Sequence, residues 1–139
     1  MEKINLKITT PEKVVFKDYV DQITLPTTTG EITVLPNHIP LISVLEPGEI
    51  KILKDNEETS LAVSGGFIEV QAEKVVILAD TAEKAYEIDV ERAEAAKERA
   101  KLAMEQKQLD TKEYALFAAR IQKELARLKV ARKHRRPGQ

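Results

Sequence analysis

Residues 88–104 read IDVERAEAAKERAKLAM, a stretch of charged residues and alanines that contains no glycine or proline. This stretch lies within residues 67–136, a segment that contains neither glycine nor proline and is bounded by Gly66 and Pro137. Residues 1–66, by contrast, contain five prolines and four glycines. Because glycine and proline favour turns and interrupt helices, we expect a β-rich half followed by a helical half.

The first half contains short runs in which apolar and polar residues alternate, as they do in half-buried strands. These runs are Ile4–Ile8, Val14–Phe16, Val20–Leu25, Ile32–Val34, Leu41–Val44, Ile50–Leu53, Leu61–Val63, Phe67–Val70 and Val75–Leu78. Polar turns are predicted at residues 54–57 and 72–73. No helical pattern interrupts the runs, so residues 1–84 are expected to form a β-sandwich of about ten short strands.

The second half has the spacing of two helices. Small or apolar residues recur at steps of three and four, which is a 3.5-residue repeat. The predicted seams are Ala93, Ala96, Ala100 and Ala103 in the first helix, and Tyr114, Ala118, Ile121, Leu125 and Leu128 in the second. Asp89 and Asp110 are suitable N-caps, and residues 106–109 are read as a polar loop. Residues 85–139 are therefore expected to form an antiparallel two-helix hairpin.

Composition limits the possible classes of protein. Hydrophobic residues make up 42% of the 139 residues, which is enough for one modest core. The chain has no cysteine, so disulfides, thiol catalysis and cysteine-bound zinc are excluded. No apolar run is long enough to span a bilayer, and the N-terminus alternates like a strand rather than a signal peptide. We expect a soluble protein without a metal site.

Charge divides along the same boundary. Residues 1–82 contain 7 lysines and 13 acidic residues, whereas residues 83–139 contain 15 basic and 10 acidic residues. The basic excess is concentrated in residues 112–136, with nine cations against Glu113 and Glu124. Such asymmetry predicts a negatively charged partner: nucleic acid, an acidic protein surface, a membrane or a phosphorylated ligand.

Four cations of the helical half are spaced to meet across the hairpin. Arg92 and Arg99 share one face of the first helix, and Lys123 and Arg127 share one face of the second. Their convergence predicts an anion between the helices, since arginine forks suit phosphate oxygens and Asp89 can accept from a ribose hydroxyl or a base amine. The alternative is that these residues are solvated or cap the helix. No phosphate-binding loop or catalytic base with a partner is present, so no enzymatic activity is expected.

Three motifs resemble one family. Residues 30–41 read GEITVLPNHIPL, residues 64–70 read SGGFIEV before VVILA at 75–79, and residues 88–93 read IDVERA. In this order they resemble the signature blocks of the ε subunit of bacterial F-type ATP synthases, over about residues 3–131. The resemblance implies a β-sandwich with a C-terminal helical hairpin.

It also implies a regulatory, non-catalytic subunit of the proton-translocating complex, on the cytoplasmic face of the bacterial membrane. Its expected partners are the γ subunit, the c-ring and the α/β hexamer, with no nucleic acid. ATP bound between the helices is expected to favour the folded hairpin, and the extended arm to inhibit ATP hydrolysis. The implied nucleotide contacts are Glu83, Ile88, Asp89, Arg92, Ala93, Arg99, Lys123 and Arg127. Glu31 and His38 are implied at the c-ring, and Arg120, Lys123, Arg127 and Arg132 at inhibitory contacts.

Two positions depart from the family's pattern. Asn37 stands where the family often has glycine, and asparagine tolerates the left-handed conformation that such a turn requires. Lys123 stands where relatives that bind ATP have arginine, so a point charge replaces a bidentate fork. A competing class is a β-sandwich module with a basic arm for nucleic acid or an acidic protein, but the arm lacks the stacking aromatics of single-strand binders.

Overall fold

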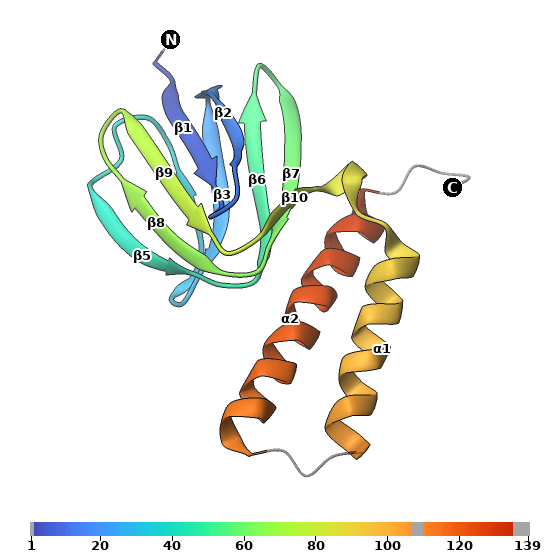
Figure 1. Cartoon of the computed structure of the whole chain (residues 1–139). Coiled ribbons are helices and arrows are strands. Elements are labelled where there is room, and N and C mark those ends of the chain that lie inside the picture. Colours follow the sequence, from blue (N-terminus) through green and yellow to red (C-terminus); the bar gives the residue numbers. More distant parts are fainter. Residues whose placement is uncertain (1, 107–109, 135–139) are drawn as a thin grey trace.

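The computed structural model describes residues 2–106 and 110–134. Ten strands come first, then one turn of 3₁₀ helix and two α-helices (Figure 1). The strands are β1 Ile4–Thr9, β2 Val14–Val20, β3 Gln22–Thr27, β4 Gly30–Val34, β5 Leu41–Leu45, β6 Gly48–Lys54, β7 Glu57–Val63, β8 Gly66–Val70, β9 Lys74–Ala79 and β10 Ala82–Lys84. The helical elements are η1 Ala85–Glu87, α1 Val90–Gln106 and α2 Thr111–Lys133.

The strands join into one sheet that curls over into a flattened sandwich. Its order is β10-β7-β6-β3-β5-β8-β9-β1-β2, and β4 pairs with β3. In the described part of the chain, β1 and β9 are the one parallel pair, whereas the other neighbours are antiparallel. The predicted sandwich followed by two helices is confirmed. One strand was missed: β10, which pairs with β7 and leads directly into the helices.

The alternating pattern fills the interior because every second side chain of a strand faces the same side. On β1, Ile4, Leu6 and Ile8 are fully buried, and on β9, Val75 and Ile77 are fully buried. Among the residues that the structure describes, 17 buried hydrophobic residues form the main core, and all of them come from residues 4–79. The sandwich therefore holds its own core without the helices.

Tight turns set the register of the strands. Asp55 and Asn56 join β6 to β7 with φ of 50° and 66°, the left-handed pair typical of a two-residue hairpin. Asn37 has φ of 65°, so the asparagine adopts the turn conformation expected of it. Gly66 begins β8 at φ of 141°, and a Cβ there would lie 2.0 Å from the carbonyl oxygen of Leu78.

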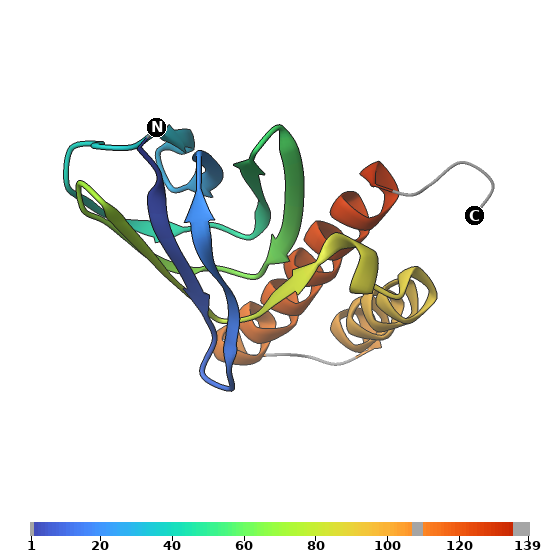
Figure 2. The ribbon, with the colours of Figure 1, turned by 90° about the horizontal axis from the view of Figure 1, so that it is seen from above.

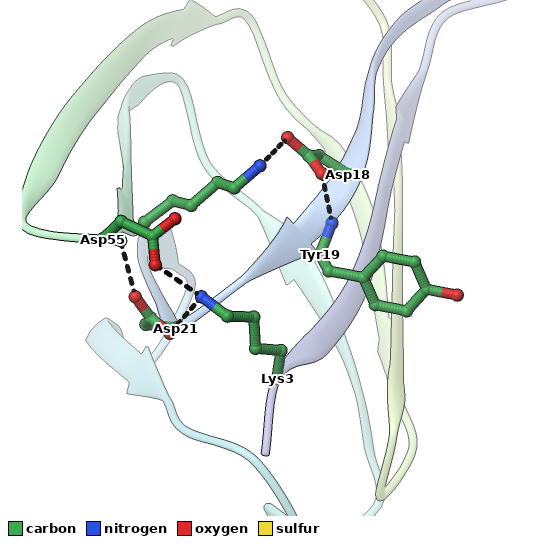
Figure 3. Close-up of polar contacts among 6 residues, drawn as sticks. Lys3, Asp18, Tyr19, Asp21 and Asp55 are labelled. Carbon is green, nitrogen blue, oxygen red and sulfur yellow. Dashed lines mark hydrogen bonds and ion pairs between the residues drawn. The ribbon is translucent and has the colours of Figure 1, made fainter. Parts of the chain in front are cut away.

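A network of ion pairs closes one end of the sandwich (Figure 3). Lys3 Nζ lies 2.9 Å from both Asp21 Oδ1 and Asp55 Oδ1, and the Asp55 amide donates to Asp21 Oδ2 at 2.7 Å. Lys54 Nζ donates to Asp18 Oδ2 at 2.7 Å. The start of β1, the β2–β3 turn and the β6–β7 hairpin are thereby tied together, although they are distant in sequence.

Both predicted helix caps are present. Asp89 Oδ1 accepts from the Arg92 amide at 3.1 Å, and Asp110 Oδ1 accepts from the Glu113 amide at 2.8 Å. The helices span 17 and 23 residues, where about 18 each were predicted. Gln106 belongs to α1, and the rest of the predicted loop, 107–109, lies outside the described residues.

Only part of the predicted helical seam is buried. Ala93, Ala100 and Leu128 are buried, but Tyr114 is 58% exposed and Leu125 is 42% exposed. α2 lies between the sandwich and α1 (Figure 2), and near its C-terminal end it packs on β6 and β7 as well as on α1, so the buried face there is not the predicted seam. Tyr114 lies at the other end of α2, away from this contact.

The second contact of α2 explains which of its residues are buried near its end. Val130 and Ala131 are buried in a small cluster with Ala62 of β7 and Ile88. A repeat of 3.5 residues describes packing against one helix, so it could not predict this face.

Candidate functional site

A pocket of about 480 Å³ lies where β10, η1, α1 and α2 meet. Residues from all four elements line it, which places the pocket at the junction between the sandwich and the hairpin. The lining residues are Glu83, Glu87, Asp89, Arg92, Ala95, Ala96, Arg99 and Arg127. Five of the eight predicted nucleotide contacts are thus brought to one pocket.

The α1 wall of the pocket follows from helical spacing. Arg92, Ala95, Ala96 and Arg99 occupy positions i, i+3, i+4 and i+7, so they share one face of the helix. Asp89 caps the same helix one turn earlier, and its carboxylate accepts the Arg92 amide. The methyl side chains of Ala95 and Ala96 project little from the helix, so a ligand has room against α1 between the two arginines.

Arg127 supplies the α2 wall and is held by two carboxylates. Its Nε and Nη2 lie 2.7 and 3.0 Å from the two oxygens of Glu83, and its Nη1 donates to Glu124 at 2.8 Å. Burial alone would lower the pKa of Arg127, but the contacts with Glu83 and Glu124 raise it. Arg127 is therefore a firmly charged guanidinium that joins β10 to α2.

The electrostatics of the site differ from the expected bare cluster of cations. The three arginines in the lining are accompanied by three carboxylates, Glu83, Glu87 and Asp89. The sequence argument considered the cations alone, whereas the lining carries as many carboxylates as arginines. Two of these acids come from β10 and η1, outside the helices from which the convergence was argued.

Lys123 and Arg120 lie beside a second hollow of about 450 Å³, which shares Ala96 and Arg99 with the first. The guanidinium of Arg120 lies 5.1 Å from the centre of the Phe117 ring, a cation–π contact. Lys123 is thus one helical turn away from the lining of the main pocket. Of the four predicted cations, Arg92, Arg99 and Arg127 line the main pocket, whereas Lys123 lines only the second hollow.

Ile88 and Ala93 are buried instead of lining the pocket. Ile88 is 9% exposed and packs against Ala62, Val130 and Ala131, whereas Ala93 is fully buried. Their side chains support the junction on which the pocket is built. Glu87, Ala95 and Ala96 were missed as lining residues, although the i, i+3, i+4, i+7 spacing between Arg92 and Arg99 could have indicated the two alanines.

Basic residues near the end of α2 are paired with carboxylates of other elements. Arg132 forms an ion pair with Glu94 of α1. Lys133 Nζ and His134 Nε2 lie 2.9 and 2.7 Å from the carboxylate of Glu49 on β6. A count of acids within residues 112–136 could not find partners that lie on other elements. The predicted basic residues Arg135 and Arg136 lie outside the described residues.

The predicted c-ring contacts lie at different ends of a strand. Glu31 is at the start of β4, opposite Pro26 of β3. His38 follows the end of β4, in a turn where the Asn37 amide donates to the Ala72 carbonyl at 2.8 Å. The two residues are therefore separated by the length of β4, and one surface meets both only if it lies along that strand.

Neither α1 nor α2, as far as residues 2–106 and 110–134 describe them, combines the length and hydropathy of a membrane-spanning helix.

Comparisons with known proteins cover nearly the whole chain. Residues 3–85 match the family "ATP synthase, Delta/Epsilon chain, beta-sandwich domain", and residues 86–132 match "ATP synthase, Delta/Epsilon chain, long alpha-helix domain". The ATP synthase epsilon chain of Chloroflexus aggregans is 47% identical over 132 residues, covering 95% of this chain and 94% of its own length. That of Dehalococcoides mccartyi is 45% identical over 136 residues, with coverage of 98% and 97%.

Solved structures share the fold. A chain from the Euglena gracilis mitochondrial ATP synthase, in a structure of OSCP, F1 and c-ring, superposes with a TM-score of 0.78 at 24% identity. The match covers 96% of this chain and 83% of the Euglena chain. A chain from the Tetrahymena thermophila central stalk and c-ring gives 0.60 at 19% identity, covering 94% and 99%. The present chain therefore belongs to the epsilon chain family of ATP synthases.

Proposed function

We propose that this chain is a non-catalytic regulatory subunit of the central stalk, and that its helical hairpin carries an ATP site. The observation that carries this proposal is the pocket in which Asp89, Arg92, Arg99 and Arg127 converge from both helices. ATP bound there would touch α1 and α2 together, so it would favour the folded hairpin over an extended arm.

The chemistry of the pocket suits recognition of a nucleotide. Arg92, Arg99 and Arg127 provide guanidinium donors for phosphate oxygens, and arginine forks bind such oxygens in pairs. Asp89 is an acceptor at the helix N-terminus, suited to a ribose hydroxyl or a base amine. The cavity volume is within the range of small-molecule sites. ATP is proposed as a regulatory ligand that is bound and released unchanged.

The β-sandwich offers a surface for the γ subunit. Val44 of β5, Phe67 of β8 and Leu78 of β9 are opposite one another in the sheet register, and each is 44–56% exposed. Ile42, 76% exposed, lies two residues before Val44 on β5 and extends this apolar row. The strands β5 and β8 lie on the side of the sandwich farther from the helices (Figure 1). Clustered exposed apolar residues of this kind mark protein interfaces. We assign γ to this face, and the c-ring to the edge along β4 that carries Glu31 and His38.

The hairpin is proposed to restrain ATP hydrolysis when α2 leaves the sandwich. In the folded state Arg127, Arg132 and Lys133 have internal carboxylate partners on β10, α1 and β6. Undocking removes these partners and leaves a strongly basic helix. Acidic segments of the α/β hexamer would then compensate the charge, with Arg120, Lys123, Arg127 and Arg132 as the proposed contacts. As part of the assembled complex, the subunit would be peripheral to the cytoplasmic face of the membrane.

Calorimetric titration with ATP tests the site. The intact chain should bind ATP, and replacing Arg92 and Arg99 together by Ala should abolish binding without unfolding the sandwich. Arg120→Ala is the matched control, since Arg120 is also a helical arginine but lies outside the main pocket. Absence of binding to the intact chain, or equal affinity of the Arg92/Arg99 variant, would contradict the proposed site.

A further inference from the structure

The fork of Arg127 is already occupied in the folded chain. A guanidinium presents its Nε and one terminal nitrogen side by side, a pair that matches the two oxygens of a carboxylate or a phosphate. In this chain both atoms of that pair lie beside Glu83: Nη2 donates a hydrogen bond to Oε2 at 3.0 Å, whereas Nε is 2.7 Å from Oε1 in an ion pair without hydrogen-bond geometry. The remaining nitrogen, Nη1, contacts Glu124. A phosphate therefore meets an arginine whose three nitrogens already lie beside carboxylates of the protein.

The other two arginines of the pocket are in a different state. Within residues 2–106 and 110–134, no ion pair involves the side chains of Arg92 or Arg99, and both side chains are exposed. Arg127 is the most enclosed of the three, with 18% of its side chain exposed. An incoming anion can thus approach the α1 arginines directly but reaches Arg127 only by competing with a carboxylate of the protein.

We propose that Glu83 is an internal substitute for the ligand phosphate: it holds the fork of Arg127 in the ligand-free chain and gives it up when a polyphosphate binds. The inference rests on the proposed ATP site and deepens it. Glu83 is then a residue that weakens affinity for the ligand, although it lines the pocket and had been predicted as a ligand contact.

The exchange has a structural consequence. Glu83 belongs to β10 and Arg127 to α2, so their ion pair ties the sandwich to the second helix. A phosphate held by Arg92 and Arg99 of α1 that captured Arg127 would tie α1 to α2 instead. Binding would therefore move one attachment of α2 from the sandwich to the other helix, and the ligand-free chain would remain folded through its own carboxylate.

The opposite role for Glu83 predicts the opposite result. If Glu83 accepted a hydrogen bond from the ligand, neutralising it would weaken binding, because the ligand donor would lose a charged acceptor. If Glu83 competes with the ligand, Glu83→Gln should strengthen binding. The amide of glutamine is nearly the same size as the carboxylate, so the substitution changes the charge and little else.

The test is calorimetry with ATP and, separately, with inorganic tripolyphosphate, at about 0.15 M salt so that distant charges are screened. Glu83→Gln should raise the affinity for both probes about fivefold, in line with loss of one partly exposed charged contact. Glu98→Gln is the matched control, because it removes one negative charge from an exposed position of α1 outside the pocket lining, and among the described residues no ion pair joins Glu98 to Arg127. Its effect should stay within about twofold.

A double-mutant cycle identifies the route of the effect. In an Arg127→Ala background, Glu83→Gln should no longer change the affinity, since Glu83 acts by holding that arginine. Weaker binding by Glu83→Gln, or the same gain with Arg127 absent, would overturn the proposal while leaving the ATP site intact.

The ion pair itself can be followed without a ligand. In the free protein, Glu83→Gln should shift the Nε–H resonance of Arg127 in an NMR spectrum, whereas Glu98→Gln should not. If the Arg127 resonance shifts but neither ATP nor tripolyphosphate binds any variant, both the proposed ATP site and the proposed replacement of Glu83 by phosphate are contradicted. If ATP binds but the Arg127 resonance does not move in Glu83→Gln, only the ion pair between Glu83 and Arg127 is contradicted, and the ATP site stands.

Discussion

At the scale of single residues, Gly66 is fixed by the backbone of the neighbouring strand. A Cβ on Gly66 would lie 2.0 Å from the carbonyl oxygen of Leu78 and 2.9 Å from Cα of Ala79, across the β8–β9 pairing. Neither atom belongs to a flexible side chain, so relief requires the strands to separate. The glycine of the SGGFIEV block thus has a packing reason in this fold.

We expect Gly66→Ala to lower the free energy of unfolding by about 3 kcal/mol or more, because backbone strain and a backbone clash add. Gly30→Ala is a suitable control: Gly30 also has a positive φ, but a Cβ there meets nothing within 4 Å. Its cost should be about 1–2 kcal/mol. Chemical denaturation of both variants measures the difference, and equal losses would show that the clash at Gly66 is relieved.

Asp21 gives a prediction of pH dependence. Its pKa lies below the ordinary 3.8, first because Lys3 donates to it and then because the Asp55 amide does. A carboxyl with a lowered pKa stabilises the folded state above the unfolded value, and this contribution is lost as the pH falls through the folded pKa. The Lys3 pKa is raised above 10.5, so its contribution is lost only in strong alkali.

Asp21→Asn should therefore lower the Tm at about pH 7, and the difference from the parent chain should shrink as the pH approaches about 3. Glu12→Gln, which alters an exposed carboxylate outside the network, should leave the Tm nearly unchanged throughout. A pH-independent difference for Asp21→Asn would mean that its charge is not what stabilises this end of the sandwich.

At the scale of elements, the C-terminal end of α2 is attached to β6 through Glu49. Burial would raise the pKa of Glu49, but hydrogen bonds from Lys133 and His134 lower it below 4.5, so the carboxylate is charged at neutral pH. In the same region Val130 and Ala131 pack on Ala62 of β7. An ionic contact and an apolar contact therefore both attach this end of α2 to the sandwich.

Glu49→Gln should loosen the last turns of α2 while leaving the sandwich folded. Amide hydrogen exchange at residues 128–133 should become about fivefold faster, since local opening follows the free energy of the contacts that close it. Glu46→Gln, an exposed carboxylate on the same sandwich, should have no such effect. Unchanged protection in Glu49→Gln would assign the docking of α2 to its apolar contacts alone.

The sequence predicted those elements whose signals are local. Alternation revealed nine strand-forming runs, and Asp89 and Asp110 were found as caps because a cap bonds within its own first turn. β10 was missed because three residues are too few to show a period. The exposure of Leu125 was missed because the 3.5-residue repeat considers one helical partner only, and α2 has a second partner in the sandwich.

The candidate site was predicted in the same uneven way. Asp89, Arg92 and Arg99 follow from spacing along one helix, and Arg127 follows from the antiparallel hairpin. The carboxylate that holds Arg127 could not be predicted, because Glu83 is 44 residues away and reaches it only through the docking of α2 on β10. Pairing between distant elements decides the charge balance of this pocket.

At the scale of the whole molecule, the sandwich and the hairpin differ in how they are stabilised. In the described part of the chain, all 17 residues of the main core belong to the strands, whereas the hairpin packs through small side chains such as Ala93 and Ala100. Alanine buries little apolar area, so the interface between the helices contributes little free energy per residue. A stable body carrying a weakly held arm is the arrangement expected of a regulatory subunit.

A chain that ends at residue 87 should therefore fold. It retains all of β1–β10, and we expect a cooperative thermal transition with a Tm within about 10 °C of the intact chain, because the main core is unchanged. Differential scanning calorimetry measures this directly. Loss of the transition would show that the sandwich depends on α2, through the cluster around Ala62.

The most direct test of the regulatory role is the rate of ATP hydrolysis by the assembled complex containing either the intact chain or residues 1–87. Both forms should assemble equally, since the proposed γ-binding face lies on β5, β8 and β9. If the arm is extended in at least about half of the complexes, the truncated chain should raise the rate at least about twofold. Equal rates at equal assembly would contradict the proposal that the helical hairpin restrains hydrolysis.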